Sequence, residues 1–393
     1  MELTTIDRFP LSGKRVFIRV DFNVPLSDTG AVADDTRIRE ALPTIHYARQ
    51  QGAIVLLASH LGRPKGKVDP AFSLKPAAER LGELLETPVK LAPDCVGPAV
   101  QAQLAQLSAG DVLVLENLRF HAGEEKNDPA FAQALAALAD VYINDAFGSS
   151  HREHASVVGM VQHFKLKGIG LLMRKEIAAL SRLLAHPEPP FVVILGGAKV
   201  SDKIGLIGSL LPRVQTMIIG GAMAYTVQKA QGVAVGKSRV EADKVAEVKT
   251  VLAEAEQRSV ALLLPKDHIV VSELKAGASA STTPGRDIPD NLLGVDIGPQ
   301  SIESFRAAIR SARTILWNGP MGVFEIPPFD QGTRALAETV AATASFSVIG
   351  GGDTVSAITQ AGLADRISHI STGGGASLEF LEAGDLPGLA ALR

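Results

Sequence analysis

Short apolar runs alternate with amphipathic stretches along the whole chain. The first half carries four such runs, at 16–20, 53–59, 112–116 and 141–145. The second half carries six more, at 191–195, 216–220, 261–265, 314–317, 346–350 and 369–372. Runs that are apolar on both faces are typical of strands covered by helices on two sides. The pattern therefore predicts an α/β fold built from doubly wound, Rossmann-like parallel sheets.

Helices are expected between these runs, and a proline-rich segment near the middle of the chain marks the boundary between two domains. Alanine-rich stretches of helical period lie at 37–51, 74–85, 130–139, 241–257 and 333–343. A further helix over 171–184 ends at the proline-rich run 186–191, just before a strand. A chain of 393 residues has room for roughly two or three domains. We therefore expect an N-terminal domain at 1–170, an interdomain helix at 171–186 and a C-terminal domain at 187–378.

Composition and charge exclude several classes of protein. The apolar share is 46%, and 39 basic residues stand against 42 acidic ones, which argues against a disordered chain and against a general nucleic-acid binder. Cys95 is the single cysteine, so an intrachain disulfide and a cysteine-rich zinc site are excluded. No leader-like segment and no apolar run long enough for a membrane span is found. These features predict a cytoplasmic protein without nucleic-acid or membrane partners.

Polar and basic residues follow each strand of the first half. In doubly wound sheets, ligands bind beyond the carboxyl ends of the strands. The segments that follow the strand ends, called exits here, are DFNVP (21–25), SHLGRP (59–64), ENLRF (116–120) and DAFGSSHREHAS (145–156). We expect these loops, with the first helix, to form a cationic cluster that binds a small polyanion through charge-assisted hydrogen bonds. Its members are Arg37, Arg63, Arg119, Arg152, His60, His151 and His154.

Two alternatives apply to this cluster. Any single arginine is better explained by an exposed ion pair or a solvated side chain, and only the shared location of the arginines beyond strand ends favours a binding cluster. His151 and His154 have the spacing of metal ligands, but no nearby cysteine or third histidine completes such a site.

Glycines follow the strands of the second half instead. They stand at 196–197, 220–221, 350–352 and 373–375. A glycine lets backbone N–H groups approach phosphate oxygens or a flat base, although a single pair is also explained by a tight turn. Four such exits favour a nucleotide. Asp353 is a candidate magnesium ligand, with a helix N-cap as the alternative.

Lys199 and Lys203 lie four residues apart near a predicted helix start. That spacing places them on one helix face, where both can reach a phosphate tail, and ordinary exposed lysines are the alternative.

Two strings imitate nucleotide-binding motifs without meeting their requirements. GVAVGKS (232–238) has three residues between its glycines where a phosphate loop has four, and it follows a helical pattern. GIGLLM (168–173) has Met173 where a dinucleotide fingerprint needs a small residue, and no clear strand precedes it. A nicotinamide-dependent dehydrogenase therefore has little support. A two-lobed binding protein without turnover remains a second alternative.

The sequence resembles the 3-phosphoglycerate kinase family over nearly its whole length. The strings that carry the resemblance occur in the family's order: RVDFNVP (19–25), SHLGRP (59–64), LENLRF (115–120), DAFG (145–148), GGAKVSDKI (196–204), WNGPMGVFE (317–325), GGGDT (350–354) and STGGGASLEFLE (371–382). The resemblance implies a monomeric, magnesium-dependent glycolytic enzyme. Its reaction would be reversible phosphoryl transfer between 1,3-bisphosphoglycerate with ADP and 3-phosphoglycerate with ATP, on closure of two domains about a hinge. It also implies that the tail 379–393 packs back on the N-terminal domain.

The same resemblance implies the site residues. Those for phosphoglycerate are Asp21, Asn23, Arg37, His60, Arg63, Arg119 and Arg152, with Arg19 beside them. Those for the nucleotide are Gly197, Ala198, Lys199, Lys203, Gly220, Gly221, Gly294, Asn318, Val323, Glu325, Gly351, Gly352, Asp353 and Thr354, and Asp353 would hold Mg²⁺. Departures from the family's pattern fall at Arg174, Glu153 and Ala383-Gly384.

The reaction itself makes few demands on proton transfer. The attacking carboxylate has a pKa of about 3.3–3.7 by analogy with an α-carboxyl group, so at neutral pH it is already ionised and needs no general base. The barrier then depends on alignment and on charge stabilisation, for which Arg37, Lys203 and Lys199 are the catalytic candidates.

Overall fold

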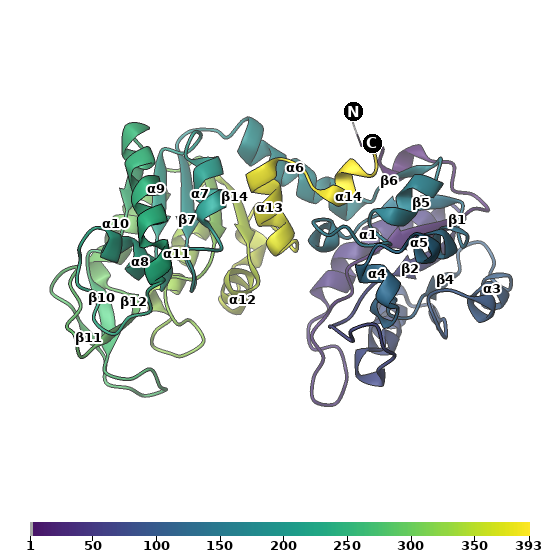
Figure 1. The fold of residues 1–393 in the computed structure, drawn as a ribbon, viewed down its shortest axis with the longest axis horizontal. Helices are drawn as coiled ribbons and strands as arrows, with labels where there is room; N and C mark the ends of the chain where they lie inside the picture. Colours follow the sequence, from purple (N-terminus) through teal and green to yellow (C-terminus); the bar gives the residue numbers. More distant parts are fainter. Residues whose placement is uncertain (1–2) are drawn as a thin grey trace. The chain divides into compact units, whose positions relative to one another are not determined.

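The structure, a computed structural model, describes residues 3–393. Its chain forms two compact units (Figure 1). Unit 1 contains the residues up to Ala178 together with Asp385–Arg393, and unit 2 contains Ala179–Gly384. Each unit is built on a six-stranded parallel sheet, which confirms the predicted fold class. Met1 and Glu2, part of the predicted N-terminal domain, lie outside the described residues.

The sheet of unit 1 has the strand order β3-β4-β2-β1-β5-β6, and all pairs are parallel. The strands are β1 (Arg15–Arg19), β2 (Ile54–Ala58), β3 (Lys90–Leu91), β4 (Val112–Val114), β5 (Val141–Asn144) and β6 (Lys167–Ile169). The four central strands match the four apolar runs. The outer strands β3 and β6 were not expected, because each is two or three residues long and begins with a lysine.

Besides the first part of α6 (Leu171–Ala185), the helices of unit 1 are α1 (Thr36–Gln50), α2 (Lys75–Leu85), α3 (Pro98–Leu104), α4 (Ala122–Glu125), α5 (Pro129–Ala136) and α14 (Pro387–Ala390). The longer helices α1 and α2 each bury an apolar face. Ile45 of α1 and Leu81 of α2 are fully buried in one core cluster with Ile18 of β1. The start of α5 follows from its sequence: the Asp128 carboxylate accepts a hydrogen bond from the Phe131 N–H at 2.8 Å, just before a proline in the first turn.

Helix α6 (Leu171–Ala185) contributes residues to both units. Its first turn is attached to unit 1, since Leu171 N–H donates to Thr44 Oγ1 at 2.8 Å and Met173 N–H donates to Asp145 at 3.0 Å. The last nine residues also belong to unit 1, where Gly388 N–H donates to the Ser150 carbonyl at 2.8 Å. Residues 379–384, which the sequence analysis assigned to the tail, belong to unit 2.

The sheet of unit 2 has the order β15-β14-β13-β7-β8-β9 and is also parallel throughout. Its strands are β7 (Phe191–Leu195), β8 (Thr216–Ile219), β9 (Ala261–Leu263), β13 (Thr314–Asn318), β14 (Phe346–Gly350) and β15 (His369–Ile370). All six coincide with predicted runs. Every residue of β7 and β13 is buried, as the apolar character of both runs requires.

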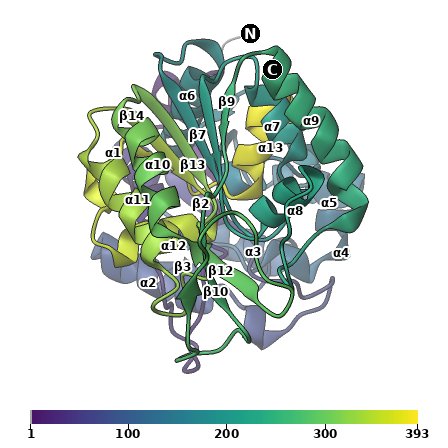
Figure 2. The same cartoon turned by 90° about the vertical axis from the view of Figure 1, so that its left-hand side faces the viewer.

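Helices cover both faces of this sheet, as Figure 2 shows for α10, α11 and α12 on one side and α7, α8, α9 and α13 on the other. Their bounds are α7 (Ile204–Leu210), α8 (Met223–Ala230), α9 (Val245–Gln257), α10 (Pro299–Arg310), α11 (Gln331–Ala342), α12 (Gly352–Gln360) and α13 (Gly375–Ala383). Within the described part of the chain, no helix combines the length and the apolar character that a membrane span needs.

Unit 2 also contains a small antiparallel sheet that the sequence analysis did not predict. It is formed by β10 (His268–Val271), β11 (Ser281–Thr282) and β12 (Leu293–Ile297), in the order β11-β10-β12. Its strands are short and separated by polar loops, so none stood out as an apolar run. Its side chains form two small clusters, one around Tyr225 and one around Phe329.

Candidate functional site

The basic residues of unit 1 gather at the carboxyl edge of four neighbouring strands, β4, β2, β1 and β5. Arg19, His60 and Arg119 are almost completely buried there, with exposed fractions of 1%, 6% and 3%. Burying several cations together costs free energy unless they are paired or bind an anion. We call these residues, with Arg37 and Arg152, the basic cluster.

A hydrogen bond between two cluster members fixes the state of His60. The Arg19 guanidinium donates to His60 Nδ1 at 3.3 Å. Because a guanidinium can only donate, Nδ1 must accept, and His60 is neutral with its proton on Nε2. Burial, together with the charges of Arg19 and Arg119, holds the pKa of His60 well below its ordinary value. His60 therefore offers the cluster a neutral N–H donor.

Asp21 and Asn23 organise the loop that follows β1. Arg37 of α1 donates to Asp21 Oδ2 at 2.6 Å, and the pair is partly buried. The Asn23 side chain accepts from Gly62 N–H at 2.9 Å, which ties the loop after β1 to the loop after β2. The structure thus brings Asp21, Asn23 and Arg37 together as the resemblance implied.

Arg119 keeps part of its guanidinium free. Its NH1 group donates to the Gly62 carbonyl at 2.8 Å, and Nε lies 3.3 Å from Glu125. Its NH2 atom is buried and has no hydrogen-bond partner among the described residues. A buried donor without a hydrogen-bond partner costs folding free energy, so it indicates an anion as the missing partner. Arg63, by contrast, is exposed beside Gly62.

Glu124 is a functional candidate that the sequence analysis missed. It is completely buried, and it accepts from Ser156 N–H at 2.9 Å and from Ser156 Oγ at 2.5 Å. Ser156 Oγ in turn accepts from Arg19 Nε at 2.9 Å. Burial raises the pKa of Glu124, and the nearby Arg19 opposes that rise. Its place just after a surface-like loop gave no signal of burial in the sequence.

The two histidines considered as metal ligands lie next to members of the basic cluster instead. Arg152 Nε donates to His151 Nε2 at 3.3 Å. Burial, followed by the charges of Arg19 and Arg119, lowers the pKa of His154 to about 3. His154 is therefore neutral at physiological pH and lies 3.8 Å from Glu124.

The glycine pairs of unit 2 meet beyond adjacent strands. Gly197, Gly221 and Gly319 have φ values of +95°, +63° and +100°, a region that side chains rarely tolerate. Their backbones interlock: Gly197 N–H donates to the Pro320 carbonyl at 2.9 Å, and Gly221 N–H donates to the Met321 carbonyl at 3.0 Å. A Cβ on Gly221 would lie 2.5 Å from the backbone nitrogen of Gly197. Glycine is therefore required here by close backbone approach.

The loop after β14 leads directly into helix α12. Gly351, with φ of +89°, is the N-cap of that helix, and Asp353 lies inside its first turn. The alternative that Asp353 is the N-cap is therefore wrong. Thr354 is buried and its hydroxyl accepts from Gly319 N–H at 2.6 Å, which joins two of the glycine turns. Asn318 lies against Gly351.

The two lysines occupy different positions from those expected. Lys203 is the N-cap of α7, while Lys199 lies outside the helix in the preceding loop, so they do not share a helix face. Lys203 is 9% exposed, and burial lowers its pKa against the opposing charges of Asp202 and Asp353. Lys199 is exposed beside Ala198, and its charge acts on Glu241. Lys203 and Asp353 are thus close enough to interact.

The residues expected around the adenosine lie on neighbouring segments. Gly294 is in β12, where its N–H donates to Ser238 Oγ at 2.9 Å and its Cα faces the Tyr225 ring. Val323 N–H donates to the Val295 carbonyl at 2.8 Å, and Glu325 is exposed in the same loop. Gly220 lies against the Met321 side chain.

The false phosphate loop GVAVGKS follows α8, as expected, and its Ser238 supports Gly294. The string GIGLLM begins inside the short strand β6 (Lys167–Ile169), where no clear strand was expected. Gly170 of that string packs against the Asp145 carboxylate, where a Cβ would lie 2.2 Å from it.

Comparison with known proteins decides between the alternatives. A profile of the phosphoglycerate kinase family matches residues 6–384. The chain belongs to the phosphoglycerate kinase family. It is 57% identical to a phosphoglycerate kinase of Solibacter usitatus and 54% identical to one of Anaeromyxobacter dehalogenans, with 100% of this chain and at least 99% of each relative covered.

Solved structures agree with this assignment. A phosphoglycerate kinase from Coxiella burnetii superposes with a TM-score of 0.90 at 41% identity, over 100% of this chain and 99% of that chain. One from Pyrococcus horikoshii gives 0.87 at 33% identity, over 98% of both chains. The protein is accordingly a phosphotransferase of glycolysis that acts between ADP or ATP and bisphosphoglycerate or phosphoglycerate.

Proposed function

We propose that this phosphoglycerate kinase binds phosphoglycerate at the basic cluster of unit 1 and the magnesium nucleotide at the glycine-lined edge of unit 2. The observation that carries the first assignment is the buried, unmatched NH2 donor of Arg119 among further cations. A bound phosphate or carboxylate supplies the acceptor that this donor lacks, through a charge-assisted hydrogen bond. His60, Arg63 and Arg152 add donors around it.

Asp21 and Asn23 suit the other end of the same substrate. A carboxylate accepts from a hydroxyl group, and an amide both donates and accepts. Asp21 already fixes Arg37 at 2.6 Å, so the residue that grips the hydroxyl end also orients a cation for the transferring group. This arrangement supports Asp21, Asn23 and Arg37 as neighbours on one ligand.

The nucleotide assignment rests on exposed backbone at the ends of four strands. Ala198, Gly351, Gly352 and Thr354 would offer N–H groups to phosphates, with the start of α12 adding the favourable field of a helix N-terminus. Gly197 would line the same phosphates, although its own N–H donates to the Pro320 carbonyl. The adenosine pocket would be formed by Gly220, Gly221, Gly294, Asn318, Val323 and Glu325. Gly221 and Gly294 would shape this pocket through close packing, because the Gly197 backbone and the Tyr225 ring occupy the space that their side chains would fill.

The donor set near α12 fits magnesium. Asp353 is exposed and provides carboxylate oxygen, the ligand type that Mg²⁺ prefers, while phosphates and water complete its usual shell. When bound, the ion neutralises charge on the nucleotide phosphates. We therefore propose Asp353 as its protein ligand.

The chain's own cations carry the remaining chemistry. The acceptor carboxylate is ionised at neutral pH, so no protein base needs to remove a proton. Lys203, Lys199 and Arg37 hold positive charge toward the phosphoryl oxygens as charge redistributes during transfer. The partial burial of Lys203 strengthens its interaction, since charges act more strongly where water is scarce. Transfer upon domain closure stays a prediction from the family.

Surface composition supports a monomer. Val68 and Leu274 are the exposed large hydrophobic side chains among the described residues, and they stand far apart in the sequence. A stable dimer usually needs a contiguous apolar patch. The free, buried Cys95 is in keeping with a reducing compartment, so we also propose a cytoplasmic location.

The assignment of ligands to units is tested by a crossed binding experiment. Calorimetric titration of Arg119→Ala with 3-phosphoglycerate should show an affinity about 10- to 150-fold lower than the parent, the cost of one charge-assisted contact. Its affinity for ADP should be unchanged. Arg15→Ala is the matched control, because Arg15 lies at the opposite end of β1 in an exposed pair with Asp140.

Turnover distinguishes the enzyme from a protein that only binds. The purified chain should form ADP from ATP only when 3-phosphoglycerate and Mg²⁺ are both present. If Arg119→Ala lowers both affinities equally, or if ADP forms without 3-phosphoglycerate, the assignment is wrong.

A further inference from the structure

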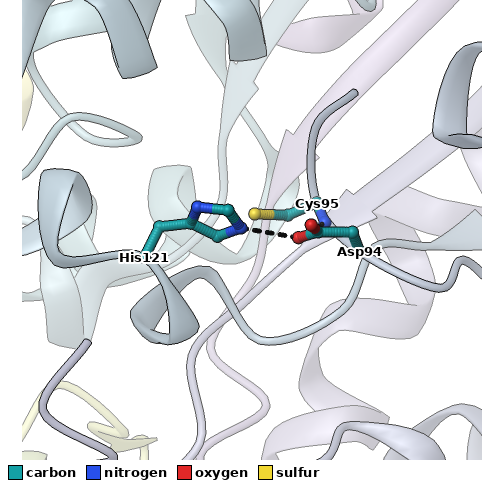
Figure 3. A group of neighbouring side chains, drawn as sticks. All are labelled: Asp94, Cys95 and His121. Atoms are coloured by element: carbon teal, nitrogen blue, oxygen red, sulfur yellow. Dashed lines mark hydrogen bonds and ion pairs between the residues drawn. The ribbon is translucent and has the colours of Figure 1, made fainter. Parts of the chain in front are cut away.

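A cluster of potential metal ligands lies in unit 1, apart from every residue assigned above. It consists of Asp94, Cys95 and His121, whose ligand atoms all lie within 4.8 Å of one another (Figure 3). Together they offer a carboxylate oxygen, a thiol sulfur and an imidazole nitrogen. No part of the proposed phosphoryl transfer uses them, so the cluster needs an explanation of its own.

The fold brings these residues together although His121 is far from the other two in the sequence. Asp94 and Cys95 lie in the loop between β3 and α3, and His121 is the N-cap of α4. The strands β3 and β4 are parallel neighbours, so their following loops emerge at the same edge of the sheet. A backbone hydrogen bond from Glu116 N–H to the Asp94 carbonyl at 3.3 Å joins the two loops. The convergence is therefore built into the sheet.

The side chains are already held in position. His121 Nε2 lies 2.7 Å from Asp94 Oδ1, and that oxygen also accepts from Cys95 N–H at 2.6 Å. The His121 ring is stacked on Phe131 of α5, with centroids 5.1 Å apart. Figure 3 shows the Cys95 sulfur directed toward the ring edge that faces Asp94. Little conformational freedom remains to be lost when an ion binds.

We propose that Asp94, Cys95 and His121 bind a thiophilic divalent cation, with zinc as the best match, separate from the magnesium of the nucleotide. Zinc takes cysteine sulfur at about 2.3 Å and histidine nitrogen or carboxylate oxygen at about 2.0–2.2 Å. In a tetrahedral site those bonds put the ligand atoms about 3.3–3.6 Å apart. The present separations of 2.7 Å to at most 4.8 Å reach that geometry through small side-chain movements.

Exposure and donor type favour this ion over its competitors. Cys95 is fully buried, while the Asp94 and His121 side chains are 44% and 34% exposed, so an ion enters from solvent and keeps water as a fourth ligand. Magnesium demands oxygen ligands in an octahedral shell, which a thiol and an imidazole do not provide. On binding, the Cys95 thiol releases its proton to water and ligates as thiolate.

A redox role for Cys95 fits the structure less well. Reactive thiols are exposed and have a lowered pKa. Cys95 is buried, and burial raises its pKa well above the ordinary value. A thiol of this kind becomes a thiolate when a cation replaces its proton.

The site lies beside the basic cluster without belonging to it. His121 directly follows the short helical turn Leu118–Phe120, which contains Arg119. It also directly precedes α4, which contains Glu124. The inference does not depend on the proposed function, and its test requires neither substrate nor turnover.

Cobalt titration of metal-free protein provides the test, because Co²⁺ occupies zinc sites and absorbs visible light. In the absence of nucleotide and magnesium, we expect one Co²⁺ per chain, visible bands of a tetrahedral centre and a near-ultraviolet charge-transfer band from thiolate to cobalt. Adding Zn²⁺ should remove these bands. Cys95→Ala should remove the charge-transfer band while keeping the buried position apolar.

Two histidine variants sharpen this test. His121→Gln, at a partly exposed position, should lower Co²⁺ affinity by about tenfold or more. His163→Gln is the matched control, since His163 is an exposed histidine of the same unit, and it should bind as the parent does. Circular dichroism melting should show both variants folded. The proposal is overturned if millimolar Co²⁺ produces no thiolate band, or if His121→Gln keeps the parental affinity.

Discussion

The two units use the same edge of the same kind of sheet in opposite ways. In unit 1 the strand ends carry large charged side chains, such as Arg19 and Arg119, that are buried and close enough for their charges to act on each other. In unit 2 the equivalent ends carry glycines, such as Gly197 and Gly221, whose backbones approach within contact distance. In the proposed function, the edge of unit 1 would bind its ligand through charged side chains, and the edge of unit 2 would bind its ligand through backbone N–H groups.

If the proposed assignment of ligands holds, this difference indicates where the binding free energy of each ligand comes from. A small polyanion has few atoms to grip, so its binding depends on strong, charge-assisted contacts, and the cations need Glu124 as a buried counter-charge. A nucleotide has a long phosphate tail and a flat base, which backbone N–H groups and open space suit well. Removing side chains should therefore harm unit 1, while adding them should harm unit 2.

The largest expected effect is on turnover, from Arg37→Ala. Loss of a cation that stabilises the transferring group lowers the rate by about 10³–10⁵ in other phosphoryl-transfer enzymes. The measurement is kcat with both substrates saturating. Arg39→Ala, in an exposed pair on the same helix, should stay within about twofold, as most exposed pairs do. An Arg37→Ala enzyme within a few-fold of the parent would show that Arg37 has no catalytic role.

The next largest effect is expected in unit 2, where a side chain is added instead of removed. Gly221→Ala places a Cβ 2.5 Å from the Gly197 backbone at a φ of +63°, so the turn must shift. Overpacking of about 1–3 kcal/mol predicts an ADP affinity roughly 5- to 150-fold lower, with 3-phosphoglycerate binding retained. Calorimetry with each ligand measures both. Gly208→Ala, where nothing described lies within 4 Å of the new Cβ, should bind both ligands normally. Equal affinities in Gly221→Ala and the parent would contradict the argument.

A smaller effect separates the metal from the nucleotide. Asp353→Asn removes a charged oxygen ligand, so affinity for Mg-ADP should fall by about tenfold or more, while binding of metal-free ADP and of 3-phosphoglycerate changes little. Titrations with and without Mg²⁺ provide the comparison, and the exposed Asp365→Asn is the control. Equal losses for Mg-ADP and 3-phosphoglycerate would count against the metal role.

The smallest effect is expected on stability at acid pH. The histidines of unit 1 that are held neutral should lower the free energy of unfolding as the pH falls. The pKa of His154 is about 3 in the folded chain against an ordinary 6.5. As pH falls below 6.5, the unfolded chain binds a proton that the folded chain does not, so stability is lost. From pH 6 to pH 5 the parent should lose about 1 kcal/mol more than His154→Gln.

Urea unfolding followed by circular dichroism at the two pH values measures this difference. The exposed His163→Gln should behave like the parent. Identical pH slopes for the parent and His154→Gln would show that His154 is not held neutral.

Much of the fold could be read from apolar periodicity. Ten strands appear where the pattern places them, because strands buried on both faces need continuous apolar runs. The predicted helices also appear, as α1, α2, α5, α6, α9 and α11, whereas the twelve-residue α10 was not predicted. The edge strands β3 and β6 were missed, because they are only two and three residues long and each begins with a lysine. The antiparallel sheet β10–β12 was also not predicted, because its short strands are specified by pairing with each other rather than by local composition.

The site divides in the same way. Residues after strand ends, such as Arg119 and Gly221, could be predicted from the sequence because the topology brings all these loops to one edge of the sheet. Asp21 was named only through the family resemblance. The prediction that Lys199 and Lys203 share one helix face was wrong, because α7 begins only at Ile204. Glu124 was missed since its burial depends on a partner, Ser156, from another loop.

The amino-acid sequence by itself determined the layered α/β architecture, the order of strand exits and the type of residue at each exit. These properties are local: each depends on periodicity or on a residue's position relative to a strand end. The tertiary structure alone decided which charges are buried together, which donor of Arg119 is left unmatched and that Cys95 meets His121. Such properties depend on contacts between segments distant in the chain, and burial then sets the energy of every charge that those contacts bring together.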